Sequence, residues 1–480
     1  MLRPVIFWFR RDLRLDDHPG LSAAVASGRP VIALFIHDET SQAMGAAAKW
    51  RLGQSLEVLA RDLGGLGCPL ILRQGAALGV LSSLIAETGA GAVYWTRYYE
   101  PAHIARDRAV KSTLRARGIE AESFGGALLV EPRSLLNGTG QPYAVFTPFW
   151  RRLRVLDMGA PMPPPARIPV PGAALASDGL DDWQMGGAMG RGAAVVAAYH
   201  RPGGAAALAR LDGFLEMALA AYPARRDFPD RPATSGLSDH LACGEISPRR
   251  IWRSVQAVVA VRPELESAAD KFLSELGWRE FAWHLMYHHP DMAHKSWRPE
   301  WDGFPWRGDN DDAVAWRRGQ TGEPIVDAAL RELYVTGRIH NRARMIAASY
   351  LTKHYLTDWR VGLDWFADCL TDWDPAANAL GWQWVSGAGP DAAPYFRVFN
   401  PRLQASRFDP DGAYVDRYLG QDRGGVSADS AAFHQAVPIS WAISKGTMAP
   451  LRISPELGRL RALNAYQVFR ARPAKEKVDR

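Results

Sequence analysis

Short apolar runs alternate with amphipathic stretches along the first 130 residues of the chain. The runs are rich in valine, isoleucine and aromatic residues, and the stretches between them repeat apolar positions at helical spacing. Strands that are apolar throughout are covered on both faces, so the pattern predicts a parallel, doubly wound α/β sheet. The expected strands cover residues 5–9, 30–38, 69–75, 92–99 and, as a weaker fifth, 127–130.

The pattern changes near residue 161, where the proline-rich stretch PMPPPARIPVPGAALASDG shows no helical or strand periodicity. Such a composition is typical of an inter-domain linker. After about residue 200 the apolar positions recur at helical spacing without strong strand-like alternation. We therefore expect an α/β domain over 1–130, a linker over 131–200 and an all-helical domain over 201–480.

Composition and charge narrow the class of protein only a little. The chain has 480 residues, enough for a large core and two or more domains. Its 57 Lys and Arg residues against 51 Asp and Glu residues give a formal net charge of +6, which permits nucleic-acid binding without requiring it. The three cysteines are far apart, which argues against a disulfide framework or a zinc site and suits a reducing cytoplasm. No signal peptide or membrane-spanning run is recognisable, so we expect a cytoplasmic protein without a membrane partner.

Three hydroxyl residues surround a glycine in TSGLSDHLACGEISPRR, which begins at Thr234. Hydroxyl and backbone donors that converge near a helix start suit a phosphate group. An ordinary capped loop is the alternative, since Ser and Thr commonly cap helices. Further along, Ser247 followed by Pro248 predicts the N-cap and first residue of another helix.

An acid, an indole and a guanidinium share one face of the helix predicted around SELGWREFAWHL. Glu275, Trp278 and Arg279 are spaced i, i+3, i+4, so they lie together on that helix. A ligand site and a solvated ion-pair face both explain this set, although an exposed tryptophan fits the second poorly. The stretch HNRARM places an amide and two arginines near another helix start, which suits a polar ligand or an ordinary charged terminus.

The stretch LTDWDPAANALGWQWVSGAG gathers carboxylates, an amide and indoles, with almost no side chain suited to hydrolysis. Asp372 and Asp374 lie two residues apart, which suggests metal binding or glycosidic acid–base work. No histidine or third carboxylate stands at ligand spacing, so we expect no metal. Asp372 and Asp374 could equally pair with an arginine or accept a hydrogen bond from a ring N–H group.

Seven ordered blocks resemble the photolyase/cryptochrome flavoproteins, and most of all their bacterial cyclobutane pyrimidine dimer photolyases. The blocks are FWFRRDLRLDDHPGL, TSGLSDHLACGEISPR, WREF, TGEPIVDAALREL, HNRARMIAASYLTK, DWDPAANALGWQW and DAAPYFRVFNP. The resemblance implies an α/β antenna domain, a helical domain that holds a U-shaped FAD, and light-driven DNA repair by a carbon–carbon lyase. Excited FADH⁻ would donate one electron to a pyrimidine dimer flipped out of UV-damaged DNA, which explains the missing nucleophile.

The resemblance also assigns residues to the flavin site. These are Tyr222, Thr234, Ser235, Gly236, Leu237, Ser238, Phe272, Glu275, Arg279, Asn341, Arg344, Asp372, Trp373, Asp374 and Asn378. Residues 234–238 would cradle the FAD phosphates. Asn378 would face flavin N5, and Arg344 would pair with Asp372. Beyond packing, no particular role is assigned to Trp373.

A second set would meet the damaged DNA or supply electrons. The residues expected to act on the dimer are Glu275, Asn341, Met345, Asn378, Trp278 and Trp384. The expected DNA contacts are Arg226, Glu275, Trp278, Arg279, Asn341, Arg342, Arg397 and Gln404. Trp382, Trp359 and Trp306 match the electron-relay tryptophans of the family, which reduce the flavin under light. The protein would act on chromosomal DNA as a monomer.

Departures from the family pattern separate its branches. Asn341 and Met345 stand where (6-4) photolyases carry histidines, which favours the cyclobutane dimer as substrate. Asn378 stands where plant cryptochromes usually carry Asp and animal ones Cys, which favours a fully reduced flavin. A blue-light photoreceptor, a (6-4) photolyase and a DNA-binding protein without catalysis are the alternatives.

The antenna chromophore and one arginine stay open at this point. Ala102 and His103 replace the Asn-Glu pair of folate-using bacterial members. Methenyltetrahydrofolate, 8-hydroxy-deazaflavin, FMN and the absence of an antenna are therefore all possible. Arg338 replaces an aromatic residue that is frequent in related proteins, and a contact with a DNA phosphate is one role open to it.

Overall fold

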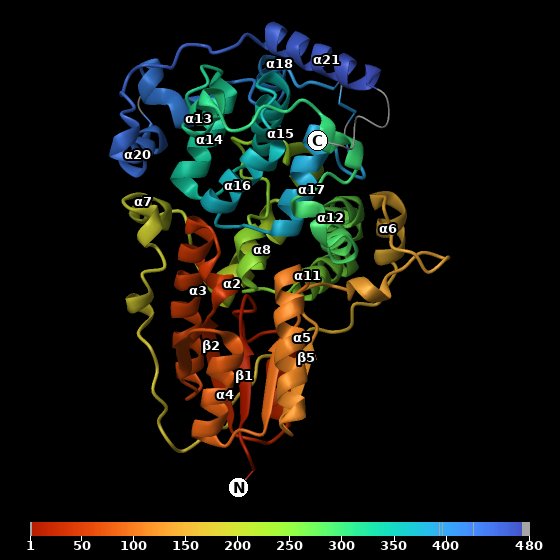
Figure 1. The fold of residues 1–480 in the computed structure, drawn as a ribbon, viewed down its shortest axis with the longest axis vertical. Helices are drawn as coiled ribbons and strands as arrows, with labels where there is room; N and C mark the ends of the chain where they lie inside the picture. The colour runs from red at the N-terminus through yellow and green to blue at the C-terminus, as the bar shows by residue number, and fades with distance from the viewer. Residues whose placement is uncertain (1, 393, 396, 426, 473–480) are drawn as a thin grey trace.

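The computed structural model describes residues 2–392, 394–395, 397–425 and 427–472. The α/β part lies at one end of the molecule with the N-terminus, and the larger helical part lies at the other end (Figure 1).

Within the described residues, five parallel strands form one sheet in the order β3-β2-β1-β4-β5. They are β1 (Val5–Phe9), β2 (Val31–His37), β3 (Leu70–Gln74), β4 (Ala92–Thr96) and β5 (Glu120–Phe124). In the register of the central strands, Val5 pairs with Val31 on one side and with Ala92 on the other. The doubly wound parallel sheet expected from the apolar runs is confirmed.

Helices cover both faces of this sheet. The helices are α1 (Pro19–Ala26), α2 (Glu39–Gln42), α3 (Ala46–Gly65), α4 (Ala77–Thr88) and α5 (Pro101–Ala116). One core joins α1 and α3 to alternate strand residues such as Phe7, and the other joins α4 and α5 to their neighbours such as Trp8. Both faces of the sheet are therefore shielded from water by helices, which is why β1 and β2 are apolar throughout.

The expected fifth strand at 127–130 is wrong. The fifth strand is EAESF, and Ala121 is its only fully buried residue, because β5 is an edge strand with polar side chains. The apolar run ALLV packs instead against the helical part, where the backbone N–H of Leu129 donates to Glu280. An apolar run alone does not say whether the chain is paired in a sheet or buried in an interface.

The segment between the sheet and the helical part is mostly irregular. It holds η1 (Pro132–Ser134), α6 (Phe146–Leu153), η2 (Leu180–Trp183), η3 (Gly187–Met189) and α7 (Gly192–Ala197). Residues 154–179 form no helix or strand and run along the α/β part, where Val31 N–H donates to Pro169 O at 2.6 Å. The domain bounds expected from the sequence stay a prediction.

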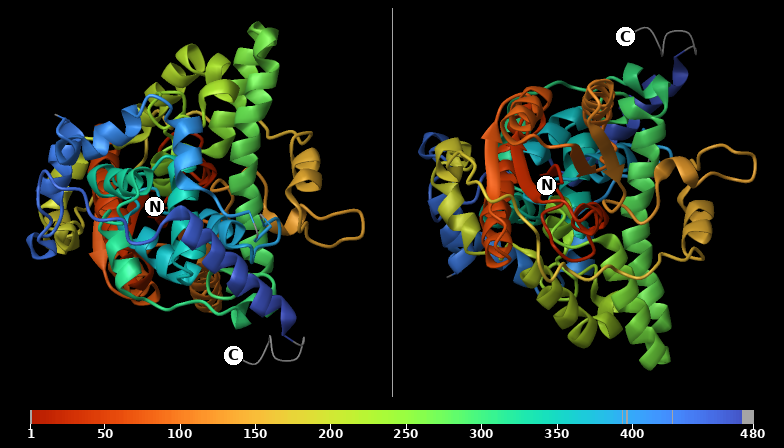
Figure 2. Two further views of the ribbon diagram at one scale, coloured as in Figure 1. Left: turned by 90° about the horizontal axis from the view of Figure 1, so that it is seen from above. Right: turned by 90° about the horizontal axis from the view of Figure 1, so that it is seen from below.

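The helical part contains two large apolar cores and two smaller apolar clusters. Its α-helices are α8 (Gly204–Met217), α9 (Tyr222–Arg225), α10 (Ser238–Cys243), α11 (Pro248–Val261), α12 (Glu266–His288), α13 (Asp311–Arg317), α14 (Pro324–Thr336), α15 (Asn341–Ser349), α16 (Trp359–Cys369), α17 (Pro375–Ser386), α18 (Pro401–Phe408), α19 (Ala413–Leu419), α20 (Ala428–Ala436) and α21 (Pro455–Ala471). One core surrounds α12, and the other surrounds α14 to α17. Seen end-on, α12 crosses this part of the molecule, and α6 lies on its outer side (Figure 2).

Two local expectations can be checked directly. Ser247 caps α11 by accepting a hydrogen bond from Arg250 N–H, with Pro248 at the first helical position, as predicted. Among the described residues, no helix combines the length and the apolar character needed to cross a bilayer.

A buried ion pair joins the α/β part to the helical part. Arg51 on α3 makes a bidentate contact with Glu245, just after α10, at 2.9 and 2.6 Å, and both side chains are shielded from water. Arg14 donates to Gly244 O at 3.0 Å beside this pair. Gly244 has φ +69°, and a Cβ there would lie 2.0 Å from Arg11 O, so only glycine allows this close approach.

Replacement of Arg51 by alanine should lower the free energy of unfolding by about 3–5 kcal/mol, because Glu245 would stay buried without its partner. Arg61→Ala on the same helix is the matched control. Arg61 forms only an exposed pair with Glu57, so its loss should cost less than about 1 kcal/mol. Urea unfolding followed by circular dichroism measures both, and equal losses would contradict the importance of the buried pair.

Candidate functional site

Residues 234–238 form a loop between α9 and α10 whose polar groups have no internal partner. Within the described part of the chain, the hydroxyls of Thr234, Ser235 and Ser238 form no hydrogen bond, and neither do the backbone N–H groups of 235–237. Thr234 and Ser238 are exposed. These donors are therefore free to bind an anion such as a diphosphate.

Asp372 and Arg344 form the centre of the expected flavin site. The predicted pairing is present, with Arg344 Nη2 2.6 Å from Asp372 Oδ2. Arg344 Nε also donates to Ile339 O at 2.8 Å, which fixes the guanidinium. The other carboxylate oxygen, Asp372 Oδ1, is buried without a hydrogen-bond partner. A buried acceptor of this kind needs a donor, and a flavin ring N–H supplies one.

Asn378 lies one turn into α17 and is buried. Its Nδ2 donates to Asp374 O at 3.0 Å, and its Oδ1 accepts no hydrogen bond from the described residues. Gly381 follows three residues later, is exposed, and would carry a Cβ with no atom within 4 Å. This side of α17 therefore presents an acceptor beside open space, which suits a flat ring with an N–H group.

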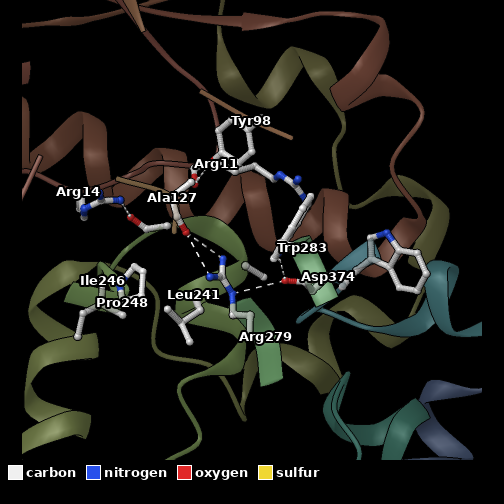
Figure 3. A pocket seen from close by; sticks show the side chains of 13 residues that line it. Arg11, Arg14, Tyr98, Ala127, Leu241, Ile246, Pro248, Arg279, Trp283 and Asp374 are labelled. Atoms are coloured by element: carbon white, nitrogen blue, oxygen red, sulfur yellow. Dashed lines mark hydrogen bonds and ion pairs between the residues drawn. The ribbon is translucent and has the colours of Figure 1, made fainter. Parts of the chain in front are cut away.

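Asp374 has a mainly structural position. Its Oδ1 caps α17 by accepting from Ala377 N–H at 2.9 Å, and its Oδ2 accepts from Trp283 Nε1 at 2.9 Å. Arg279 adds an ion pair at 3.5 Å (Figure 3). These groups line a small cavity of about 20 Å³, and Trp373 is also part of its lining.

Arg279 extends into the junction of the two parts of the molecule. Its guanidinium donates twice to Ala127 O at 3.2 Å, and only 16% of its side chain is exposed. A DNA contact would require this side chain to leave Ala127, so the expected DNA contact of Arg279 stays a prediction.

The side chains expected to surround the dimer come from three helices. Glu275 and Trp278 lie on α12, Asn341 and Met345 on α15, and Trp384 on α17, and α17 packs against both other helices. Asn341 Nδ2 lies 3.8 Å from Met345 Sδ.

Neighbours already engage part of this set. Glu275 Oε1 contacts Lys271 at 2.7 Å and also Arg226. One face of Trp278 stacks on Phe146 of α6, with ring centres 3.7 Å apart and planes at 10°. The sequence motifs did not indicate Phe146, because a stacking partner more than 100 residues away leaves no local signal.

Basic and polar residues expected to meet DNA lie around the same helices. Arg342 pairs with Asp227 at 3.0 Å and lies over the ring of Phe408 at 4.2 Å, which joins α15 to α18. Arg397 is exposed, and Gln404 on α18 is half-buried. DNA phosphates would have to compete with Asp227 for Arg342 and with Glu275 for Arg226.

The remaining expected residues lie in the two helical cores. Tyr222 packs edge-on against Phe272, with ring centres 5.5 Å apart, behind the loop 234–238. Trp382 and Trp359 are buried in the other core, with Trp306 at its margin. A Cβ on Gly362, one turn beyond Trp359, would lie 2.0 Å from the Trp382 ring, so α16 and α17 touch at that indole.

A larger cavity of about 330 Å³ lies beside the carboxyl ends of β4 and β5. It is lined by Trp95, Arg97, Tyr98, Tyr99, Ile104, Asp107, Arg108, Lys111, Ser123, Glu131, Pro132, Arg133 and Tyr287. Aromatic rings and cations dominate this lining. Elsewhere in the described ranges, no group of three or more His, Cys, Asp or Glu residues could hold a metal ion.

Comparison with known proteins identifies the family. Residues 5–167 match the model described as DNA photolyase, and residues 272–441 match the FAD binding domain of DNA photolyase. A deoxyribodipyrimidine photo-lyase of Agrobacterium fabrum is 46% identical over 417 residues, which cover 87% of each chain. This chain belongs to the DNA photolyase family.

Other members of the family are also similar to this photolyase-family chain. A crystal structure of a bacterial class III photolyase from Agrobacterium tumefaciens matches with a TM-score of 0.91 and 42% identity over 98% of each chain. Cryptochrome-1 of Arabidopsis thaliana is 35% identical over 86% of this chain and 62% of its own length.

Glu280 gives the junction near the flavin site a pH dependence. Burial raises the pKa of Glu280 to about 7, against opposing effects of Arg279 at 3.2 Å and Leu129 N–H at 2.8 Å. Between its ordinary pKa of 4.5 and about 7, the folded protein keeps a proton that the unfolded chain has released. The free energy of unfolding should therefore fall as pH rises through this window.

Glu280→Gln should remove that decline, because an amide does not titrate. Relative to the variant, the wild type should lose up to about 3 kcal/mol of stability between pH 4.5 and pH 7.5. Urea unfolding of both proteins at several pH values measures the difference. Parallel pH profiles would show that Glu280 ionises normally in the folded protein.

Proposed function

We propose that this protein repairs DNA under light by splitting cyclobutane pyrimidine dimers, with FAD as its cofactor. The observation that carries the proposal is Asn378 on α17, whose Oδ1 accepts no hydrogen bond from the described residues. Helix α17 packs against α12, which holds Glu275, and against α15, which holds Asn341, Arg344 and Met345. The relative from A. fabrum is named for this activity, and we extend that activity to the present chain.

The residues present fit FAD. The free donors of 234–238 suit its diphosphate, and the unpartnered Asp372 Oδ1 suits a ring N–H. Reduced FAD, once bound and excited by light, supplies an electron donor of high energy. Asn378 Oδ1 accepts but cannot donate, so it favours the flavin form that carries a proton at N5.

The chain's own residues would bind and orient the dimer. Glu275 and Asn341 would hydrogen-bond to the damaged bases, and Trp278 and Trp384 would provide stacking surfaces, each of which stabilises by about 1–3 kcal/mol. Flipping a damaged base costs less than flipping an intact one, so the pocket selects lesions without reading sequence. No nucleophile or general base is required of the protein.

Trp382, Trp359 and Trp306 would pass an electron inward from the surface to restore the reduced cofactor. Trp382 and Trp359 are buried, and Trp306 lies at the margin of their core. The ring nitrogens of Trp359 and Trp306 are buried without a hydrogen-bond partner. This relay is separate from the dimer pocket, since its indoles pack toward α16.

A second chromophore would occupy the 330 Å³ cavity beside β4 and β5. Tyr98 and Tyr287 offer aromatic faces, and Arg97, Arg108 and Lys111 offer positive charge, which suits a flat anionic molecule. Its identity among folate, deazaflavin and FMN stays a prediction, as do monomeric action and a cytoplasmic location.

The purified holoprotein should repair UV-irradiated oligo(dT) under near-UV or blue light and leave it unrepaired in the dark. Release of dimers is followed by the recovery of thymine absorbance at 260 nm, and an action spectrum reports any antenna. An oligonucleotide with a single (6-4) lesion is the matched control and should stay unrepaired. Repair of that lesion alone would refute the proposed substrate, and purification without flavin would refute the cofactor.

Trp382→Phe should abolish photoreduction of the oxidised flavin and leave repair by chemically reduced protein within about twofold of wild type, because refilling the cofactor and donating an electron to the dimer are separate steps. Trp252→Phe in the other helical core is the control and should keep both activities. Flavin absorbance under illumination and the oligo(dT) assay measure the two steps. Equal loss of both would contradict the separation of relay and repair.

A further inference from the structure

An arginine that no sequence motif singled out lies against the loop 234–238. Arg210 is on α8, and a Cβ on Gly236 would lie 2.7 Å from its Nη1 atom. Gly236 has φ +60°, a backbone conformation that favours glycine. The guanidinium is thus seated on the loop whose free donors suit a diphosphate.

Arg210 lacks the partners that a half-buried cation normally has. Within the described part of the chain it forms no hydrogen bond and no ion pair. Burial and the positive charge of Arg338 lower the pKa of Arg210, while Asp239 opposes them. The guanidinium therefore feels the charge of a second cation as well as that of one acid, Asp239.

The nearest acid is already shared among other groups. Asp239 contacts His200 at 3.0 Å, Arg51 at 3.6 Å and Arg338 at 3.7 Å. Arg338 also donates to Tyr199 O at 2.7 Å, which holds it beside Asp239. The side chain of Arg338 therefore points toward the interior of the protein.

Charge around the loop does not balance without a ligand. Arg51, Arg210 and Arg338 face two acids, Asp239 and Glu245, and Glu245 is bound by Arg51. Of these three arginines, Arg210 is the one that forms no ion pair within the described part of the chain. A cation without such a partner at a half-buried site is costly unless an anion binds there.

We propose that Arg210 is a direct ligand of the FAD diphosphate and that Arg338 raises the positive potential at the same place. The proposal rests on the proposed FAD binding. A guanidinium fork donates to two phosphate oxygens at once, which the hydroxyls of 234–238 cannot do. Arg338 then serves the cofactor loop, and its possible contact with a DNA phosphate is not needed.

Release of FAD from the holoprotein tests this directly. The protein is diluted in the dark, and the fluorescence of free FAD is followed at NaCl concentrations from about 50 to 500 mM. Arg210→Met keeps the side-chain length without the charge and should release FAD about 10- to 100-fold faster than wild type, with a weaker dependence on salt. Arg210→Lys keeps the charge without the fork and should fall between them.

Arg253→Met is the matched control, since Arg253 is a partly exposed arginine on α11 with its own partner, Asp157, away from the loop. Its FAD release should equal that of wild type. Arg338→Met should release FAD a few-fold faster and bind undamaged DNA with unchanged affinity. A change in DNA affinity with unchanged FAD release would overturn the role given to Arg338.

Two results separate this inference from the proposed function. Arg210→Met or Arg210→Lys protein that releases FAD at the wild-type rate and with the wild-type salt dependence would overturn the inference, while dimer repair by wild type would still stand. Wild-type protein that purifies without flavin would instead refute the proposed function. If Arg210→Met does not fold, Arg210→Lys decides the outcome, because it conserves charge and most of the volume.

Discussion

The arrangement of this molecule depends on the buried pair between Arg51 and Glu245. Neither charge reaches water, and the two-pronged contact between them fixes α3 of the α/β part against the end of α10. Gly203 N–H and His240 also contact Glu245, and Asp239 lies 3.6 Å from Arg51. Two further hydrogen bonds lie beside the pair and hold the two parts together. The Arg14 side chain donates to Gly244 O, and Leu13 N–H donates to Cys243 O. A junction held by desolvated charges is specific, because any other register would bury one of them alone.

The same short segment carries the cofactor loop and the domain junction. Residues 234–238 lead into α10, which begins at Ser238, and Glu245 follows the helix, so less than two turns of helix separate the expected phosphate ligands from the buried pair. Asp239 connects the two, since it meets Arg51 of the α/β part and Arg338 of the helical part. The α/β part therefore positions the cofactor loop mechanically, whether or not a second chromophore is bound in it.

The sequence predicts those features that depend on one local segment of the chain, such as a buried strand. Strands β1, β2 and β4 are buried throughout, and the edge strand β3 is buried over Leu70–Leu72, so all four could be found as apolar runs. The other edge strand, β5, carries mainly polar side chains and could not. The pairing of Arg344 with Asp372 was available from the family motifs. Three other contacts could not be predicted, because each depends on which distant segment lies opposite. They are the contact of Arg279 with Ala127, the stacking of Trp278 on Phe146 and the contact of Arg210 with Gly236. The partner of Arg338 could not be predicted either, because its charge suits a DNA phosphate and Asp239 equally well.

Helix α17 separates the two electron transfers by its own geometry. An α-helix turns by about 100° per residue, so Trp382 lies about 40° from Asn378 around the axis, and Trp384 lies on a different side. Trp382 is buried against Gly362 and Phe366 of α16, whereas Trp384 is only partly buried. In the proposed function, an electron that refills the cofactor and an electron that reaches the dimer would therefore cross different faces of one helix. Because Asn378 and Gly381 stand between those faces, the flavin ring they accommodate would be the one group in contact with both.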